Sequence, residues 1–309
     1  MKRYRAILVG NGTMGSRHRT RFEACGVDFV AIADDRKEFT GIACALPEVD
    51  FAVIASPASS HYFYAKFFLE RRIPVFVEKP LATTAEEARE LVDLAERGGV
   101  TLFVAQSECY NPLFLNFRKH FLAELNRVRE KSGDCSGVRL EFRREHRHSE
   151  RCRDVDVALD LLVHDLSLFF TLFNLQDVQV ERFDGGPHAG NSGSLDFARM
   201  RLTVAKGTCR GVVADFYVNR DSDCDVRTIS VDFTREKSSY TVSLARYTPE
   251  GEIAHIPDSL DNEHRFFLKL LAGACTEWGH RAAQTAAVVI DVATQNFLFC
   301  MRNAKSLYK

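Results

Sequence analysis

The sequence has no long hydrophobic run and almost no net charge. Its longest purely apolar runs are far shorter than the roughly 20 residues that a membrane helix needs. The 41 Lys and Arg nearly balance the 42 Asp and Glu, for a formal net charge of −1. A protein held to nucleic acid by its overall field would be strongly basic. We therefore expect neither a membrane nor a nucleic acid as a partner.

The nine cysteines include no CxxC pair, which excludes a zinc ribbon and a thioredoxin-type redox pair. Near the N-terminus only Ala6–Val9 forms an apolar run, whereas a signal peptide needs about 7–15 such residues. An odd number of cysteines without a secretory signal is typical of reduced thiols in a cytoplasm. We therefore expect a cytoplasmic protein without a metal site. His146 and His148 could form half of one, but no nearby acid completes it convincingly.

What the sequence does contain is a change of pattern part-way along the chain. The first third alternates short β-type runs with helical patterns, which predicts a parallel sheet covered on both faces. From about residue 138 longer strands follow, interrupted by one apolar helix, which indicates an α+β domain on a mostly antiparallel sheet. A length of 309 residues allows about two domains of roughly 100–200 residues each. We place the first domain at 1–118 and the second at 119–309.

The predicted elements are as follows. The strands are Tyr4–Val9, Val27–Ala33, Phe51–Ala55, Pro74–Val77, Val100–Ala105, Val138–Arg144, Val178–Phe183, Leu195–Ala205, Thr208–Val218, Thr228–Phe233 and Tyr240–Ala245. The main helices are Ser59–Arg71, Thr84–Arg97, Ser107–Glu130, Val155–Phe173, Leu260–Ala274 and Ala282–Asn303, with a short irregular piece expected over 35–50.

Directly after the first strand comes a turn that matches GxGxxG, Gly10-Asn11-Gly12-Thr13-Met14-Gly15. Gly10 allows the tight turn, Gly12 lets the backbone approach a pyrophosphate, and Gly15 allows close packing of helix on strand. The helix that follows offers free N–H groups to phosphate oxygens. The alternative is a glycine turn in an α/β protein that binds no nucleotide.

Asp34 closes the second strand, near the spacing of about 20 residues expected for the acid that binds the adenosine ribose hydroxyls. Its carboxylate should repel a 2′-phosphate, which favours NAD. Arg36 could partly offset that repulsion and accept NADP. Motif and acid together predict a Rossmann dinucleotide-binding domain that holds NAD, with NADP possible.

A second motif, Glu78-Lys79-Pro80, lies at the end of the fourth predicted strand. Ligands of such sheets bind beyond the carboxyl ends of the strands, so Lys79 points to the site of the chemistry. The alternative is a surface ion pair at a strand end.

Taken in order, these motifs resemble the Gfo/Idh/MocA oxidoreductase family, named after glucose–fructose oxidoreductase and inositol dehydrogenase. Between them lies Ala55-Ser56-Pro57-x-x-x-His61, and the second domain contains Asp160-Leu-Leu-Val-His164, similar to the family's DxxxH element. Asn111-Pro112 is similar to the family's crossover segment, and the resemblance spans nearly the whole chain. It implies a cofactor site made of Gly10, Gly12, Thr13, Met14, Gly15, Asp34, Arg36, Ser56, Pro57, His61, Glu78 and Lys79.

Removing a hydride from a carbinol requires a group that takes the hydroxyl proton. The resemblance implies that His164 is the acid/base, that Lys79 polarises the substrate oxygen, and that Asp160 orients one of these groups or a sugar hydroxyl. Which of Lys79 and His164 takes the proton stays open. Asp160 and His164 are spaced i,i+4 and share one helix face; they could instead form a solvated pair, but their apolar surroundings favour a cleft. Asp165 points away and is expected to be structural.

The segment from Arg143 to Arg153 holds five Arg against two Glu. Arginine clusters suit the capture of phosphate or carboxylate. We expect Arg151 and Arg153 to contact an anionic substrate, together with Lys79, Asp160 and His164; the alternative is a solvated loop of mixed charge.

These observations predict an NAD(P)-dependent dehydrogenase that acts on CH–OH groups of a sugar, cyclitol or nucleotide-sugar. One subset of the family oxidises the 3-hydroxyl of UDP-N-acetylglucosamine. The alternatives are a non-catalytic NAD(P)-binding regulatory sensor and an NAD-dependent redox-neutral glycosidase. Members of the family commonly pair through the open face of the second sheet, so we expect a homodimer or homotetramer. The residues expected on one face of that sheet are Phe197, Met200, Leu202, Val204, Phe216 and Val218.

Overall fold

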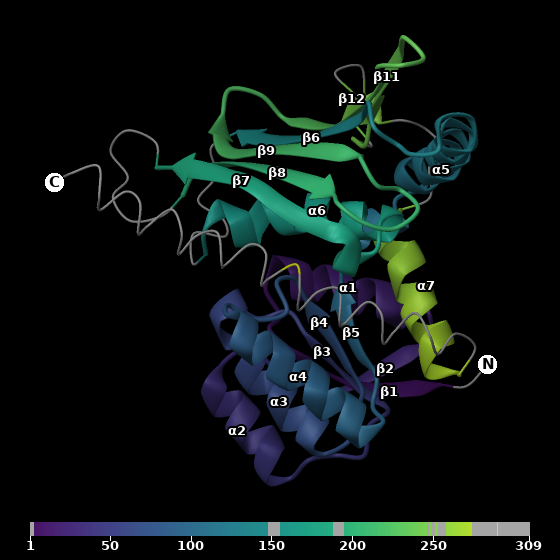
Figure 1. The fold of residues 1–309 in the computed structure, drawn as a ribbon. Helices are drawn as coiled ribbons and strands as arrows, with labels where there is room; N and C mark the ends of the chain where they lie inside the picture. The colour runs from purple at the N-terminus through teal and green to yellow at the C-terminus, as the bar shows by residue number, and fades with distance from the viewer. Residues whose placement is uncertain are drawn as a thin grey trace, which may run out of the picture. The chain divides into compact units, whose positions relative to one another are not determined.

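The chain groups into two compact units. The computed structural model describes residues 3–147, 155–187, 195–245, 247–248, 251–252, 258–273 and 289. The described residues of 1–107, with 258–273 and 289, form the first unit, and those of 108–252 form the second (Figure 1). The division therefore falls before α5 (Pro112–Ser132) rather than near residue 118, inside it. In addition, α7 (Ser259–Leu271) returns to the first unit.

The first unit is built on a five-stranded parallel sheet of order β2-β1-β3-β4-β5, as the alternating pattern predicts. Helices α2, α3 and α4 lie on one face of the sheet, and α1 and α7 on the other (Figure 1). Because both faces are covered, strands β1, β3 and β5 are almost continuously apolar and buried, whereas the edge strand β2 is mostly half-buried. The elements are β1 Tyr4–Val9, α1 Thr13–Ala24, β2 Val27–Ala33, α2 Arg36–Cys44, β3 Phe51–Ile54, η1 Ala58–Ser60, α3 His61–Glu70, β4 Val75–Glu78, α4 Ala85–Gly98 and β5 Leu102–Ala105.

The expectation of an irregular piece over 35–50 is wrong, because α2 occupies most of it. Asp35 caps this helix by accepting a hydrogen bond from the Glu38 N–H at 2.7 Å. The Glu38 carboxylate in turn accepts from the Asp34 N–H at 2.7 Å. This reciprocal arrangement is close to a capping box and starts a helix of only nine residues.

Helix α7 packs into the first unit through one buried face that carries both apolar and polar residues. Its buried residues Glu263, His264, Phe267 and Leu270 follow helical spacing, so they share one face. The Phe267 ring lies 5.1–6.0 Å from the centroids of four other rings, those of Phe22, Phe51, Phe76 and Phe103. An ion pair at 2.6 Å between Arg21 and Asp258 adds a polar contact at the start of the helix.

The second unit contains a six-stranded sheet of order β11-β10-β6-β9-β8-β7. All its pairs are antiparallel except β6 with β9, which confirms the mostly antiparallel prediction. The elements are η2 Ser107–Tyr110, α5, β6 Val138–Arg147, η3 Ala158–Leu162, α6 Val163–Leu172, η4 Leu175–Asp177, β7 Val178–Gly186, β8 Phe197–Val204, β9 Val213–Ser222, β10 Val226–Phe233, β11 Ser238–Ser243, β12 Tyr247–Thr248 and β13 Gly251–Glu252.

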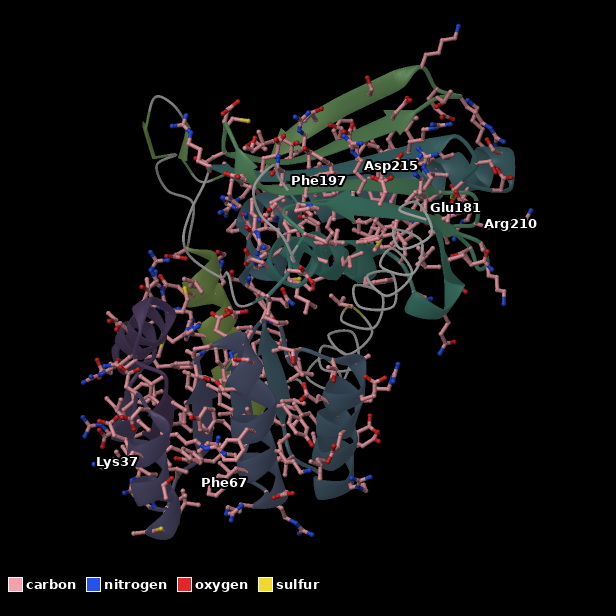
Figure 2. All side chains as sticks on the ribbon, turned by 90° about the vertical axis from the view of Figure 1, so that its left-hand side faces the viewer. Lys37, Phe67, Glu181, Phe197, Arg210 and Asp215 are labelled. Atoms are coloured by element: carbon pink, nitrogen blue, oxygen red, sulfur yellow. The ribbon has the colours of Figure 1, made fainter. Side chains whose placement is uncertain are left out.

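Two expectations for this unit need correction. The strand predicted at Thr208–Val218 begins later, because a turn with Gly211 at φ +99° joins β8 to β9. Five of the six residues predicted on one sheet face are buried there, but Phe197 lies half-buried on the opposite face. That opposite face is charged, since Arg201 pairs with Asp215 there at 2.7 Å. Phe197 and Asp215 are both labelled in Figure 2.

The helix predicted at Ala282–Asn303 lies outside the described residues. Within the described residues, no helix has the length and apolar character to cross a membrane.

Candidate active site

The phosphate-binding turn is tightly packed at Gly10 and Gly15 and open at Gly12. Gly10 has φ +88°, and a Cβ there would lie 2.5 Å from the Ser56 nitrogen. A Cβ on Gly15 would lie 1.9 Å from the Gly10 oxygen, so the helix approaches the strand as closely as backbone allows. A Cβ on Gly12, by contrast, would meet nothing within 4 Å, and no side chain caps α1 at this residue. The turn, with Thr13 and Met14 opening α1, therefore fits a dinucleotide pyrophosphate.

Asp34 and Arg36 lie beside this turn at the end of β2. The Asp34 carboxylate accepts a hydrogen bond from the Asn11 N–H at 2.6 Å, which fixes it next to the turn. The Arg36 guanidinium lies over the Phe63 ring at 4.5 Å, in cation–π geometry. The turn and the acid are thus brought together as the motif predicts, while Arg36 is held by an aromatic ring.

Ser56, Pro57 and His61 form the loop after β3 and the start of α3. Both ring nitrogens of the buried His61 contact backbone carbonyls, Nδ1 that of Pro80 at 2.7 Å and Nε2 that of Ser56 at 2.8 Å. A carbonyl oxygen can only accept, so both nitrogens donate, as in an imidazolium. His61 therefore joins the loop after β3 to the loop after β4.

Glu78 and Lys79 end β4, and the Lys79–Pro80 peptide bond is cis. One Glu78 oxygen lies 2.7 Å from His18 Nε2, and the other accepts from the Lys79 N–H at 3.0 Å. Burial acts to raise the pKa of the Glu78 carboxyl, but the hydrogen bond from His18 and the charges of His18 and Lys79 hold it below its usual range. Glu78 is thus a largely buried anion, its side chain 13% exposed, and not a member of a surface ion pair.

Three residues that the sequence analysis missed surround Glu78. His18 Nδ1 lies 2.9 Å from His264 Nε2, and His264 Nδ1 contacts the Leu260 carbonyl. Burial and the nearby His18 lower the pKa of His264 to about 3. Burial and the Glu78 carboxylate raise the pKa of Glu263 well above its usual range, so Glu263 is a neutral acid. No local pattern marks these residues, because α1 and α7 are far apart in the sequence.

In the second unit, Asp160 and His164 lie on two different kinds of helix. The helix predicted over Val155–Phe173 begins instead as a π-helix, Ala158–Leu162, which carries Asp160 and continues into α6 with His164. Asp160 is buried and His164 half-buried. Short π-helical turns are frequent at functional sites.

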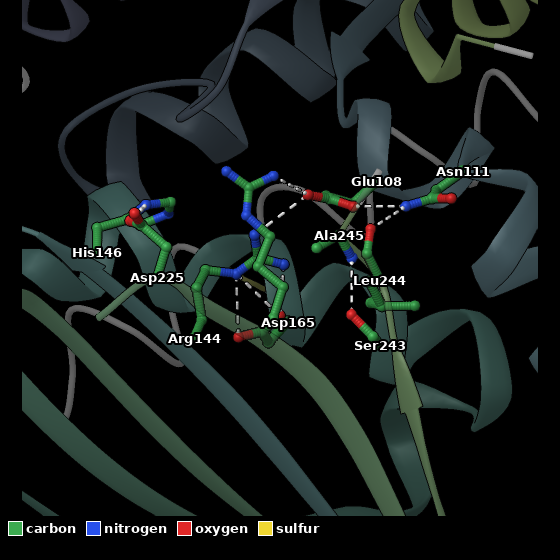
Figure 3. Close-up of polar contacts among 10 residues, drawn as sticks. Glu108, Asn111, Arg144, His146, Asp165, Asp225, Ser243, Leu244 and Ala245 are labelled. Atoms are coloured by element: carbon green, nitrogen blue, oxygen red, sulfur yellow. Dashed lines mark hydrogen bonds and ion pairs between the residues drawn. The ribbon is translucent and has the colours of Figure 1, made fainter. Parts of the chain in front are cut away.

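Asp165 anchors α6 in a buried ionic cluster (Figure 3). Arg144 Nη2 donates to Asp165 at 2.8 Å, and Arg144 Nη1 and Arg227 Nη1 donate to Glu108 at 3.2 and 3.0 Å. Burial raises the pKa of Asp165 despite Arg144. Burial acts the same way on Glu108, but there Arg144 and Arg227 hold the pKa below its usual range. Asn111 also donates to Glu108, at 3.2 Å. The structural role expected for Asp165 is thus supported.

The described part of the basic segment, Arg143–Arg147, is strand and not loop. Its first residues belong to β6, where Arg143 pairs with Glu145 and Arg144 is only 2% exposed. Arg144 is therefore unavailable to a substrate. Arg151 and Arg153 lie outside the described residues. Within the described part of the chain, no cluster of three or more His, Cys, Asp or Glu side chains could hold a metal ion.

Comparison with known proteins supports this arrangement. Residues 15–106 match the GFO_IDH_MocA family model, described as "Oxidoreductase family, NAD-binding Rossmann fold". The chain is 22% identical over 323 aligned positions to UDP-N-acetylglucosamine 3-dehydrogenase of Acidithiobacillus ferrooxidans, covering 95% of this chain and 98% of that one. Residues 15–106 thus carry the NAD-binding Rossmann unit of this oxidoreductase family.

Two solved structures share the fold of this chain over nearly its whole length. GenD2 from gentamicin A biosynthesis, in complex with NAD, is 20% identical with a TM-score of 0.73, covering 96% of this chain and 94% of that one. The WlbA dehydrogenase from Bordetella pertussis, in complex with NADH and UDP-GlcNAcA, is 16% identical with a TM-score of 0.72, covering 96% of each chain. At these identities the likeness concerns the fold. The family match over residues 15–106 identifies the first unit as the NAD-binding Rossmann unit of an oxidoreductase.

The ionic cluster predicts that removing one of its charged side chains strongly lowers the free energy of unfolding. Arg144→Met leaves the buried Asp165 and Glu108 carboxylates short of one guanidinium, so we expect a loss of about 3–5 kcal/mol in the free energy of unfolding. Urea denaturation measures it. Arg139→Met, on an exposed position of the same strand, should cost less than about 0.5 kcal/mol. Equal effects of the two substitutions would contradict the role given to the cluster.

Glu263 predicts a pH-dependent stability. A carboxyl whose pKa is raised by folding contributes stability that is present below its ordinary pKa of 4.5 and is lost as the pH rises toward the folded value. Glu263→Gln removes this titration. Urea denaturation between about pH 5 and 8 should therefore show the variant gaining stability relative to wild type as the pH rises. Glu70→Gln, at an exposed site on α3, should give a constant difference, and a constant difference for Glu263→Gln would show that its pKa is not raised.

Proposed function

We propose that the chain is an NAD-dependent dehydrogenase that transfers a hydride between the nicotinamide and a hydroxyl of a sugar, cyclitol or nucleotide-sugar. The observation that carries the proposal is the combination, in one unit, of an open Gly12 turn beside Asp34 with Lys79 at the carboxyl end of β4. A parallel sheet binds its ligands at this end of its strands. Residues 1–107 are accordingly assigned to dinucleotide binding, and the second unit to substrate binding and oligomerisation.

The cofactor would be held by this chain's backbone and by few side chains. The N–H groups at the start of α1 would receive the phosphates, and Asp34 the adenosine ribose hydroxyls. Negative charge on Asp34 opposes a 2′-phosphate and favours NAD. Arg36 would have to leave the Phe63 ring in order to contact NADP. Ser56, Pro57, His61 and Glu78 complete the proposed site, with His61 and Glu78 acting by fixing the loops after β3 and β4.

The chemical step assigns one role to each of three residues. Bound NAD supplies the hydride acceptor for alcohol oxidation. Lys79 donates a hydrogen bond to the substrate oxygen and stabilises the charge that develops there. His164 is the proposed acid/base, and Asp160 orients a substrate hydroxyl or one of the two other groups. The proton passes to His164 or to Lys79, and the variants below distinguish these two routes.

A nucleotide-sugar is the substrate class best supported. The Acidithiobacillus relative is named for UDP-N-acetylglucosamine, and WlbA was solved with UDP-GlcNAcA. Arg151 and Arg153 would provide the cationic contacts that a diphosphate needs. The 3-hydroxyl of UDP-N-acetylglucosamine is one candidate position. We also propose a cytoplasmic location, supported by the free thiols of all six cysteines in the described residues.

The proposed activity predicts reduction of NAD by one class of alcohol. Purified protein is mixed with NAD or NADP and with separate pools of sugars, cyclitols, sugar acids and UDP-sugars, and the absorbance of reduced nicotinamide is followed. Lys79→Ala and His164→Ala should each lower kcat by about 10²–10⁴-fold while NAD still binds. Lys37→Ala, on exposed α2, is the control. The variant that loses the alkaline rise of the pH–rate profile identifies the group that takes the proton.

Two other results would replace the proposal by its alternatives. Measurable NAD binding without reduction in any pool would favour a regulatory sensor. Tightly retained NAD together with cleavage of a glycosidic bond, and no net reduction, would identify a redox-neutral glycosidase. Absence of dinucleotide binding would overturn the interpretation of the Gly10–Gly15 turn.

We further propose that the chain forms a homodimer or homotetramer through the open sheet face of the second unit. Arg199 and Arg143 lie over the Tyr217 ring there, at 5.3 and 5.7 Å, and Arg201 pairs with Asp215. Alternating charges with half-exposed aromatics suit self-complementary contact. Light scattering should give two or four times the monomer mass of 34.9 kDa, and Tyr217→Glu should lower it. A monomeric wild type would contradict this.

A further inference from the structure

A continuous set of hydrogen bonds lies under Lys79 in the first unit. It runs from the Leu260 carbonyl on α7 to His264, from His264 Nε2 to His18 Nδ1 at 2.9 Å, and from His18 Nε2 to Glu78 at 2.7 Å. The second Glu78 oxygen accepts from the Lys79 N–H at 3.0 Å. We call His18 and His264 with these contacts the histidine bridge.

The direction of the bridge follows from which atoms can donate. The Leu260 oxygen only accepts, so His264 Nδ1 carries a proton and donates to it. His264 is neutral, because its pKa lies near 3, and its Nε2 is therefore an acceptor. It follows that His18 Nδ1 donates to His264. In the remaining hydrogen bond, one proton lies between His18 Nε2 and the Glu78 carboxylate.

The apolar rings around the histidine bridge favour a single hydrogen-bonding arrangement of its two imidazoles. His18 and His264 are both fully buried. The His264 ring lies 4.2 Å from the Phe22 centroid and 5.4 Å from that of Phe76, and the His18 ring lies 5.1 Å from Phe76. In such an apolar environment, an imidazole that lost its partner would leave a buried polar group unsatisfied.

The charged and titratable neighbours of the bridge are few. Glu263 lies on α7 beside it and is neutral, and His61 and Lys79 act on Glu78 through their positive charge. Arg21, on α1, acts on His264 in the same direction as burial. The partner of His18 Nδ1 is the His264 ring, at 2.9 Å.

We propose that His18 and His264 are positioning residues that hold Lys79 through the Glu78 carboxylate. The inference rests on the proposed function, in which Lys79 acts on the substrate oxygen. His18 lies on α1, the helix that begins at the phosphate-binding turn, and His264 lies on α7. The bridge therefore fixes the end of β4 to the helix that would hold the cofactor phosphates, and makes α7 part of the site's support.

A pair of substitutions at His264 tests the bridge. His264→Leu removes the acceptor for His18, so Lys79 should lose its fixed position, and kcat should fall about tenfold or more while the Kd for NAD changes by less than about twofold. In His264→Gln the amide NH₂ can donate to Leu260 and the amide oxygen can accept from His18, so most of kcat should return. Lys269→Gln, on the exposed side of α7, is the control. An unchanged kcat in His264→Leu, or equal losses in the Leu and Gln variants, would overturn the proposal.

A second measurement tests the bridge without using activity. Nitrogen-15 NMR of the imidazoles, with His18 and His264 assigned by substitution, reports which ring nitrogens carry protons. We expect His264 to be protonated only at Nδ1 between about pH 5 and 8 and His18 to be protonated at Nδ1. A His264 protonated at Nε2 would contradict the bridge. If none of the substrates tested supports reduction of NAD by the wild type, the proposed function fails. The NMR result then still decides whether the histidine bridge exists.

Discussion

The largely buried carboxylate of Glu78 is the constraint around which the first unit is organised. An isolated carboxylate in a protein interior would cost far more than folding can supply, so it requires charged or hydrogen-bonded partners. His18 lies at 2.7 Å and the Lys79 N–H at 3.0 Å, while His61 contributes positive charge from the loop after β3. The need to satisfy one anion thus ties together α1, β4 and the adjoining loops, which are the parts that would contact the dinucleotide.

The second unit solves a similar problem with different groups. Asp165 and Glu108 are buried and are compensated by Arg144 and Arg227 instead of by histidines. In each unit a proposed catalytic residue is the sequence neighbour of a buried acid: Lys79 follows Glu78, and His164 precedes Asp165. Anchoring the neighbouring side chain fixes the backbone at the proposed reactive residue. Misplacement of about 1 Å can cost about 10²-fold in rate, which makes such anchoring valuable.

The sequence predicted those parts of the fold and site whose cause is local. The GxGxxG turn, Asp34 and the parallel sheet follow from residues near one another in the chain, and α2 could have been found from the Asp35–Glu38 capping pair. The π-helical turn around Asp160 has no such local signature. Nor does the contact between His18 and His264, which are 246 residues apart, or that of Arg144 with Asp165. These pairs depend on how elements distant in the sequence pack together. Nothing in the sequence distinguishes the buried Arg144 from the other arginines of the basic segment.

The 24 phenylalanines connect composition to site geometry. Phe22 and Phe76 pack against the His264 ring, and Phe267 packs against both of these phenylalanines. The stacked rings of Phe142 and Phe216 lie on the buried face of the second sheet. An aromatic interior admits little water, so a polar group within it has few alternative partners and its hydrogen bonds acquire a defined direction. A smaller aliphatic residue in place of Phe76 would leave space beside both histidines, and that space would weaken the constraint on their orientation even if every polar atom were retained. In this protein the apolar core therefore contributes to more than stability: it determines how sharply the buried acids can position the residues beside them.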